Sequence, residues 1–245
     1  YGQMMIECVI PDGVAIISLL EACSNQEALY QGKRVHSICV GRDLDEVGNP
    51  LTSALISFYG KCGHLSEASQ ILFETSVQDV VSWSALIKAH VNLRHGEDAF
   101  RLFVQMEHKG LKADRVCLIT VLDVCTCNSA LHEGKLLHNR ITEMELEQDL
   151  VVGTGLVVMY GKCGSIESAR KVFELLPNKD VICWNAMVGS YAQCGYNHEV
   201  SALLHEMEMV DLKPSKITFV SILDSCASGS ALDEGRSIHA CLMEV

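Results

Sequence analysis

The chain repeats itself at a spacing of 101 residues, and this period constrains its fold more than any other feature. The pentapeptide Tyr-Gly-Lys-Cys-Gly occurs at residues 59–63 and again at residues 160–164, and Trp83 returns as Trp184. A fixed period is typical of a solenoid, in which a unit cannot bury its own apolar face and stacks on its neighbours. We therefore expect an extended binding surface rather than a single catalytic pocket.

Each period divides into parts of 31, 35 and 35 residues. The predicted units are a partial unit at 1–12, long units at 13–48, 115–149 and 216–245 (truncated), short units at 49–79 and 150–180, and standard units at 80–114 and 181–215. Because the first and last units are incomplete, we interpret the chain as an internal fragment of a longer array.

Each unit is expected to form two short amphipathic helices. In the unit 80–114, Trp83, Leu86 and Ile87 share one helical face. Gly96 and Gly195 are predicted to terminate first helices of their units. No alternating apolar and polar run indicates a sheet. The predicted fold is therefore all-α, a right-handed α-solenoid of about seven stacked helix-turn-helix units that form one domain.

Composition excludes several classes of protein. No apolar stretch approaches the ~18 residues of a membrane span, so we expect no membrane partner. The twelve cysteines are scattered through helical patterns, which favours reduced thiols in a reducing compartment over a disulfide framework. The net charge of −12 argues against indiscriminate binding of duplex DNA, which depends on neutralising phosphates.

No catalytic or metal-binding constellation is found, and no cofactor is expected. His36, His138 and His239 recur at one register, but successive members lie three units apart and cannot share an ion. Cys62 and Cys163 are separated in the same way. Phosphate-loop and nucleophile-elbow motifs are absent from the sequence. We therefore do not expect an enzyme, and we interpret the recurrent histidines as packing or surface residues.

Four segments resemble the pentatricopeptide repeat family. They are Asp-Val-Val-Ser-Trp-Ser-Ala-Leu-Ile at 79–87, Asp-Val-Ile-Cys-Trp-Asn-Ala-Met-Val at 180–188, Met-Tyr-Gly-Lys-Cys-Gly at 159–164 and Ala-Arg-Lys-Val-Phe at 169–173. The order of standard, long and short units resembles the P-L-S subclass of plant proteins. The resemblance implies a binder of single-stranded RNA that reads one base per unit in a concave groove.

The resemblance also implies a cellular role. It places the protein in a mitochondrion or chloroplast and implies RNA processing or the selection of cytidines for C-to-U editing. The chemistry would then belong to editing or processing cofactors or to a separate deaminase-like domain. An alternative that the residues leave open is a helical-repeat scaffold that binds a basic protein partner.

In this family the fifth and last residues of a unit read the base. Here these pairs are Ser53 with Asp79, Ser84 with Asp114, Thr154 with Asp180, and Asn185 with Ser215. A hydroxyl with aspartate resembles a guanine-preferring pair, and asparagine with serine resembles a pyrimidine-preferring pair. The long units carry Ile17, Ile119 and Val220 at the fifth position, which cannot hydrogen-bond a base edge. The implied register is n-G-G-n-G-(C/U)-n.

The second residue of each unit is the family's apolar clamp between bases. These residues are Val14, Pro50, Val81, Val116, Val151, Ile182 and Ile217. Lys61 and Lys162 occupy a position where family members place a lysine near the RNA backbone.

Other roles compete with base recognition. The small polar residues at the fifth positions, and the terminal aspartates, could cap helices instead, and the two roles can coexist. Trp83 and Trp184 lie on apolar helical stripes, which favours packing between repeats over stacking on bases.

Overall fold

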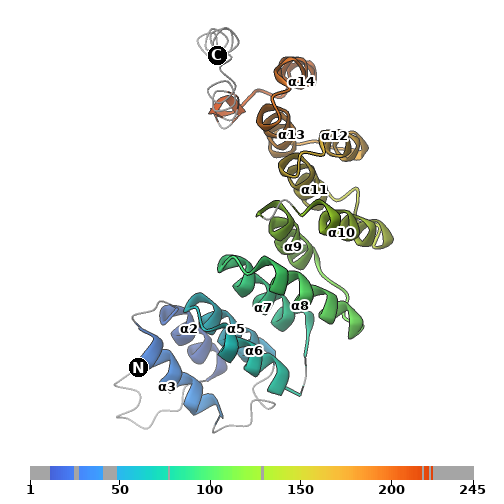
Figure 1. Cartoon of the computed structure of the whole chain (residues 1–245). Helices are drawn as coiled ribbons and strands as arrows, with labels where there is room; N and C mark the ends of the chain where they lie inside the picture. Colours follow the sequence, from blue (N-terminus) through green and yellow to red (C-terminus); the bar gives the residue numbers. More distant parts are fainter. Residues whose placement is uncertain are drawn as a thin grey trace. The chain divides into compact units, whose positions relative to one another are not determined.

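The computed structural model describes residues 12–24, 28–40, 49–76, 78–127, 130–216, 218–220 and 222, and every regular element in this part of the chain is helical. The helices are α2 (Gly13–Ala22), α3 (Leu29–Val40), α5 (Asn49–Lys61), α6 (Leu65–Glu74), α7 (Val80–Asn92), α8 (Gly96–His108), α9 (Arg115–Cys127), α10 (Leu131–Glu143), α11 (Leu150–Lys162), α12 (Ile166–Leu175), α13 (Val181–Gln193) and α14 (Asn197–Met209). They form consecutive pairs (Figure 1), which confirms the predicted all-α repeat fold.

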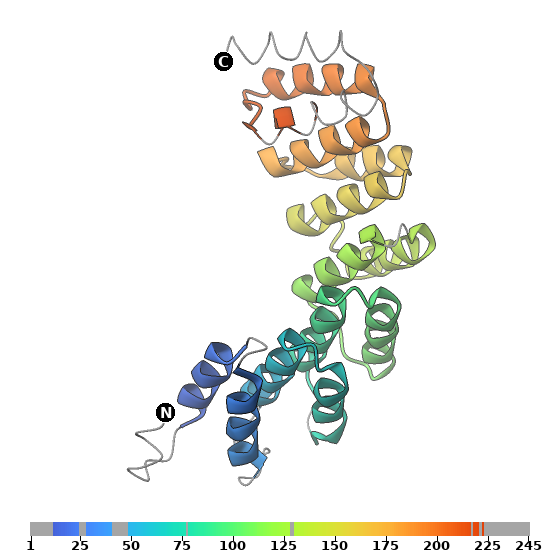
Figure 2. The ribbon, with the colours of Figure 1, turned by 60° about the vertical axis from the view of Figure 1, so that its left-hand side comes forward.

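The chain divides into an N-terminal half, residues 1–124, and a C-terminal half, residues 125–245. In the N-terminal half, α5 packs between α2 and α7, while α3, α6 and α8 pack on the first helices of their own pairs. In the C-terminal half, α11 packs on α13, and α12 and α14 pack on α11 and α13 (Figure 2). The first helices α2, α5 and α7 of one half therefore lie side by side, as do α11 and α13 of the other, and their second helices flank them.

An aspartate begins most of the first helices. The Oδ1 atom of Asp79 accepts a hydrogen bond from the backbone N–H of Ser82 at 2.8 Å, and that of Asp180 accepts one from Cys183 at 2.8 Å. The same contact occurs at Asp12, Asp114 and Asp149. Each such cap satisfies an otherwise unpaired N–H and contributes about 1 kcal/mol to helix stability. The predicted capping role of the terminal aspartates is therefore confirmed.

A left-handed residue separates the two helices of a pair. Gly63, Gly164 and Gly195 hold this place with φ between 73° and 81°. Between α7 and α8 the residue is Arg94, with φ of 62°. The prediction that Gly96 terminates the first helix of its unit was wrong, because Gly96 is the first residue of α8. The left-handed residue of this turn is Arg94 rather than a glycine, so the glycine pattern placed the end of the first helix two residues too late.

Replacing Arg94 by glycine is expected to raise the free energy of unfolding by about 1 kcal/mol. A side chain with a Cβ atom is strained in the left-handed region, and Arg94 is exposed, so no buried contact is lost. Urea unfolding followed by circular dichroism measures the change. Arg94→Ala serves as the control, since it removes the same charge but keeps the Cβ atom. Equal stability of the two variants would contradict the account.

The tryptophans pack between repeats, as predicted. Trp83 is fully buried, and its ring meets the edge of Phe73 from the preceding pair at a centroid distance of 5.8 Å. Trp184 and Phe173 repeat the contact at 5.0 Å. Edge-to-face geometry of this kind adds about 0.5–1.5 kcal/mol to the burial of the rings. Both tryptophans are buried in the core, so neither offers its ring to a base as a stacking platform.

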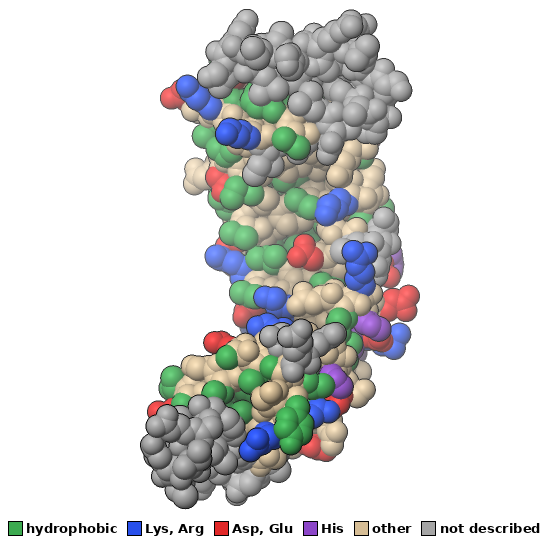
Figure 3. Space-filling view, turned by 90° about the vertical axis from the view of Figure 1, so that its left-hand side faces the viewer, with side chains coloured by type: hydrophobic (Ala, Val, Ile, Leu, Met, Phe, Trp, Pro, Cys, Tyr) green, Lys and Arg blue, Asp and Glu red, His purple; other side chains and the backbone are tan. Residues whose placement is uncertain are grey.

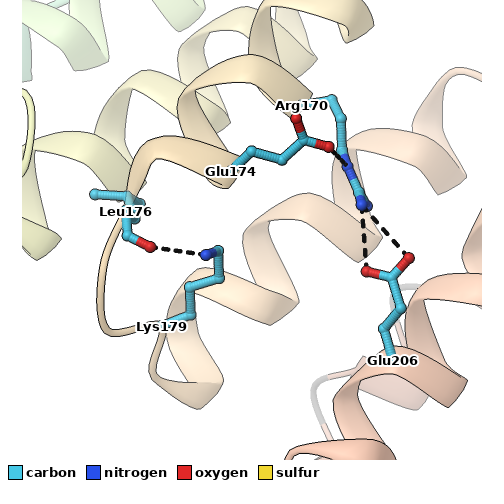
Figure 4. Close-up of polar contacts among 5 residues, drawn as sticks. All are labelled: Arg170, Glu174, Leu176, Lys179 and Glu206. Carbon is cyan, nitrogen blue, oxygen red and sulfur yellow. Dashed lines mark hydrogen bonds and ion pairs between the residues drawn. The ribbon is translucent and has the colours of Figure 1, made fainter.

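Two cations of the C-terminal half are engaged in packing as well. The guanidinium of Arg170 on α12 binds Glu174 at 2.7 Å and Glu206 on α14 at 3.2 Å, and so joins two successive pairs (Figure 4). Lys179 donates a hydrogen bond to the carbonyl of Leu176 at 2.7 Å (Figure 4). The carboxylates raise the pKa of Arg170, although partial burial acts in the opposite direction and is the largest single effect. We therefore assign both cations to the scaffold.

In two places a histidine and a tyrosine join the second helix of one pair to the first helix of the next, α3 to α5 and α10 to α11. The Nδ1 atom of His36 lies 2.8 Å from the hydroxyl of Tyr59, and the same distance separates His138 from Tyr160. Burial lowers the pKa of both histidines, while Glu74 and Glu147 respectively raise it by a smaller amount. The predicted packing role of the recurrent histidines is confirmed for these two; His239 lies outside the described residues.

Acid is expected to destabilise the fold through this histidine pair. Each folded-state pKa lies below the unfolded value of 6.5, so the fold favours the neutral ring. The stabilisation is complete above pH 6.5 and is lost as the pH falls from 6.5 through the folded-state pKa. Melting temperatures at pH 7.5 and pH 5 measure it, with about 2–4 °C lost per kcal/mol. The melting temperature of the double variant His36→Gln/His138→Gln should fall less between pH 7.5 and pH 5 than that of the parent chain. An equal fall in the two proteins would reject the assignment.

Candidate nucleic-acid interface

An exposed apolar residue stands at the second position of each first helix. The exposed fractions of these branched side chains range from 49% for Val151 to 73% for Val14. We call this set the apolar row: Val14, Pro50, Val81 and Val116 in the N-terminal half, and Val151 and Ile182 in the C-terminal half. Hydrophobic side chains recur between charged ones on the face drawn in Figure 3. The predicted clamp residues are thus solvent-accessible, except that Ile217 lies outside the described residues.

The exposure of the row has no explanation in the packing of the fold. Isolated exposed apolar side chains are common on proteins, but these recur at one register of successive repeats. Valine and isoleucine are stiff at χ1, so each presents a fixed apolar surface. Such a surface can cover the face of a planar base, which every nucleotide offers regardless of sequence. The row therefore suits a ligand built from flat, regularly spaced groups.

The predicted base readers at the fifth positions lie one helical turn beyond the row. Residues three apart on a helix share a face, so each fifth residue neighbours its own row residue. Ser53 donates a hydrogen bond to the carbonyl of Pro50 at 3.0 Å. Ser84 and Thr154 are half-buried, and the Ser84 hydroxyl oxygen is itself buried without a hydrogen bond. The fold thus holds the Ser84 hydroxyl at the base of the row rather than projecting it into solvent.

The last residues of the units combine capping with partial exposure. Asp79 and Asp180 are half-buried and Asp114 is exposed. All three use Oδ1 for their caps, so none of these hydrogen bonds occupies Oδ2. A carboxylate can therefore cap a helix and still accept hydrogen bonds from a ligand.

One predicted pair is joined directly. The Nδ2 atom of Asn185 donates to the hydroxyl of Ser215 at 3.1 Å. The pairs with aspartate, namely Ser53 with Asp79, Ser84 with Asp114 and Thr154 with Asp180, show no hydrogen bond between their members in the described structure. At the fifth position of the predicted long units, Ile17 and Ile119 are partly buried and Val220 is exposed. None of these side chains carries a polar group that could hydrogen-bond a base.

The two predicted phosphate-binding lysines lie away from the row. Lys61 is the last residue of α5 and Lys162 the last residue of α11, and both are exposed. At 1.5 Å per residue, a first helix of this length separates its lysine from its row residue by about 16 Å. An RNA strand that follows the row crosses successive first helices, so to reach either lysine it must also span this distance along the axis of that helix.

The described residues contain no group of three or more His, Cys, Asp or Glu side chains that could hold a metal ion. Burial raises the pKa of the Cys117 thiol to about 11 and that of the Cys125 thiol to about 12, so both stay protonated at neutral pH. None of the described helices has the length and apolar character that crossing a membrane requires.

The sequence reasoning missed the third residue of each unit. Cys117, Cys183 and Thr218 are fully buried, yet each lies against the polar fifth residue of the preceding unit. A signal was present in the sequence: third residues that follow a polar fifth residue are Ser, Cys or Thr, whereas Leu51 and Val152 follow units with an isoleucine there.

Comparison with known proteins matches this chain to a family of repeat proteins. The model of the PPR repeat family matches residues 78–129 and 179–228, and the PPR repeat model matches residues 52–75 and 154–181. A chloroplastic pentatricopeptide repeat-containing protein of Arabidopsis thaliana is 33% identical over 97% of this chain and 38% of its own length. A mitochondrial one is 36% identical over 93% of this chain and 22% of its own length.

Solved structures share the fold. The pentatricopeptide repeat protein PPR10, crystallised in complex with an 18-nt psaJ RNA element, aligns with 100% of this chain and 36% of its own at a TM-score of 0.77 and 20% identity. PPR10 from maize aligns at a TM-score of 0.69 and 16% identity. The chain thus spans well under half of the relatives it matches.

Proposed function

Because the chain belongs to the pentatricopeptide repeat family, we propose that it binds single-stranded RNA along its first helices, one nucleotide per helical pair. The observation that carries the proposal is the apolar row, exposed at the second position of six successive pairs. The relative PPR10 was crystallised with an RNA element, and its fold matches that of this chain.

In the proposed complex, bases lie between neighbouring row residues. The fifth and last residues then meet the Watson–Crick edge, which only an unpaired base exposes. Hydroxyl and aspartate pairs read guanine at the second, third and fifth nucleotides, and Asn185 with Ser215 reads a pyrimidine at the sixth. The isoleucines of the long units leave the first and fourth nucleotides unread. Lys61 and Lys162 contact the RNA backbone.

The proposed role is recognition, with no chemical step in this chain. The protein selects a site in an organellar transcript for processing or C-to-U editing, and a separate domain or cofactor performs the reaction. Relatives with chloroplastic and mitochondrial names support an organellar location. The net charge of −12 predicts that affinity depends on base contacts more than on phosphates.

Fluorescence anisotropy with a labelled seven-nucleotide RNA tests the proposal. We expect the 245-residue chain to bind n-G-G-n-G-C-n at least about tenfold more tightly than the strand with adenines in place of guanines, a difference of about 1.4 kcal/mol. A duplex of the same sequence should bind weakly, since its base edges are paired. Failure of a folded, monomeric sample to bind any single strand would reject the proposal and favour a protein partner.

A further inference from the structure

Three of the four polar third residues, Cys117, Cys183 and Thr218, occupy the junction between two predicted readers, whereas the hydroxyl of the fourth, Ser82, is buried without a hydrogen bond. The backbone N–H of each of the three donates to the last residue of the preceding unit: Cys117 to Asp114 at 2.7 Å, Cys183 to Asp180 at 2.8 Å, and Thr218 to the Ser215 hydroxyl at 3.3 Å. The third residue is therefore fixed in place by one reader. Its side chain is buried and directed away from solvent.

The same side chains lie against the other reader. The hydroxyl of Thr218 donates to the Oδ1 atom of Asn185. Burial raises the pKa of the Cys183 thiol, and a hydrogen bond with Thr154 lowers it by a smaller amount. The Ser84 hydroxyl likewise lowers the pKa of the Cys117 thiol by a smaller amount than burial raises it, although this hydroxyl lacks good hydrogen-bond geometry. The contact therefore recurs in both halves of the chain.

At Thr218 the hydrogen bonds form a closed network. The Thr218 oxygen accepts from the backbone N–H of Ser215 at 2.9 Å, so its single proton is available for Asn185 Oδ1. The Asn185 Nδ2 atom then donates to the Ser215 hydroxyl at 3.1 Å. One N–H of the amide remains for a ligand. Cytosine and uracil both offer carbonyl acceptors to such a donor.

We propose that the third residue of a unit is a positioning residue that orients the base-reading fifth residue of the preceding unit and thereby decides which base that reader accepts. The proposal rests on the proposed function. It makes recognition a property of three side chains that span the boundary between units. It also explains why Leu51 and Val152, which follow Ile17 and Ile119, have no polar group to offer.

The variant Thr218→Val tests the proposal, because it removes the hydroxyl at nearly constant volume. We expect the preference for cytosine over adenine at the sixth nucleotide to fall by about tenfold, the scale of one hydrogen bond, since the amide is free to rotate. The preference for guanine at the fifth nucleotide should not change. Thr218→Ser should restore discrimination. The matched control is Thr52→Val, which alters a buried threonine outside the third positions.

An RNA-free measurement separates this proposal from the proposed function. In nuclear magnetic resonance spectra of the free protein, the two Nδ2 protons of Asn185 should shift and exchange faster with solvent in Thr218→Val than in the parent chain. Unchanged side-chain resonances would overturn the positioning role whether or not RNA binds. Altered resonances with unaltered base preference would overturn its part in specificity, whereas absence of RNA binding by the parent chain would overturn the proposed function.

Discussion

Replacing Gly161 by alanine is expected to lower the free energy of unfolding by roughly 2–3 kcal/mol, the cost of overpacking a tight contact. Gly161 lies on α11 where this helix crosses α13. A Cβ atom there would come within 2.0 Å of the Ser190 Oγ atom and 2.4 Å of the Ser190 Cβ atom. A change of the Ser190 rotamer cannot relieve this clash, because the backbone Cα atom of Ser190 lies only 3.2 Å from the added Cβ atom.

The matched control for this substitution is Gly189→Ala. Gly189 lies inside α13, and a Cβ atom built on it meets nothing within 4 Å. Removing a helical glycine at an open site should stabilise the protein by about 0.5–1 kcal/mol. Urea unfolding of both variants measures the contrast. Similar free energies of unfolding for Gly161→Ala and Gly189→Ala would show that the packing of α11 on α13 does not require a glycine at position 161.

The contact also explains the repeated pentapeptide. Its first glycine is Gly161 in one copy and Gly60 in the other, where a Cβ atom would lie 2.4 Å from Ala89 Cβ. The motif thus holds adjacent first helices together, and the spacing of the row depends on it.

Replacing Val151 and Ile182 together by aspartate is expected to weaken RNA binding by about 100-fold. The change removes two apolar surfaces from bases, each worth about 1 kcal/mol or more, and adds charges beside phosphates. Stability should change little, because both residues are exposed in the first turn of a helix, where the dipole favours acidic groups. Anisotropy titration measures affinity, and circular dichroism confirms folding.

The control for charge is Leu175→Asp. Leu175 is 58% exposed, comparable with Ile182 at 69%, but it ends α12 and lies outside the row. Its substitution should leave affinity within about twofold of the parent, since a lone exposed charge is largely screened at physiological salt. Equal losses for this variant and for the single variant Ile182→Asp would mean that net charge, not the row, governs binding.

Local patterns predicted the helices well because one register recurs. Trp83 and Leu86 mark a buried stripe, and Asp79 marks the start of a helix, whatever the neighbouring repeat contains. Arg94 shows the limit of this reasoning: glycine is the usual sign of a left-handed residue, and here it is absent.

The site was only partly predictable, because its geometry spans two repeats. Exposure of Val81 follows from its place in the first turn of α7, but the burial of the Ser84 hydroxyl beside Cys117 depends on how the next helix packs. The link from Asn185 to Thr218 likewise joins residues 33 apart in the chain. Contacts of this kind become visible only when the units are stacked.

The most direct measurement of the central claim is a transfer of recognition within the chain. The double variant Thr154→Asn/Asp180→Ser gives the unit 150–180 the reader pair of the unit 181–215. Serine also caps helices well, so α13 should keep its start. Binding to a set of seven-nucleotide RNAs should show that preference at the fifth nucleotide changes from guanine to pyrimidine, while the second and third nucleotides stay guanine-selective. Retained guanine preference at the fifth nucleotide, or an equal loss for every RNA, would contradict base reading by these residues.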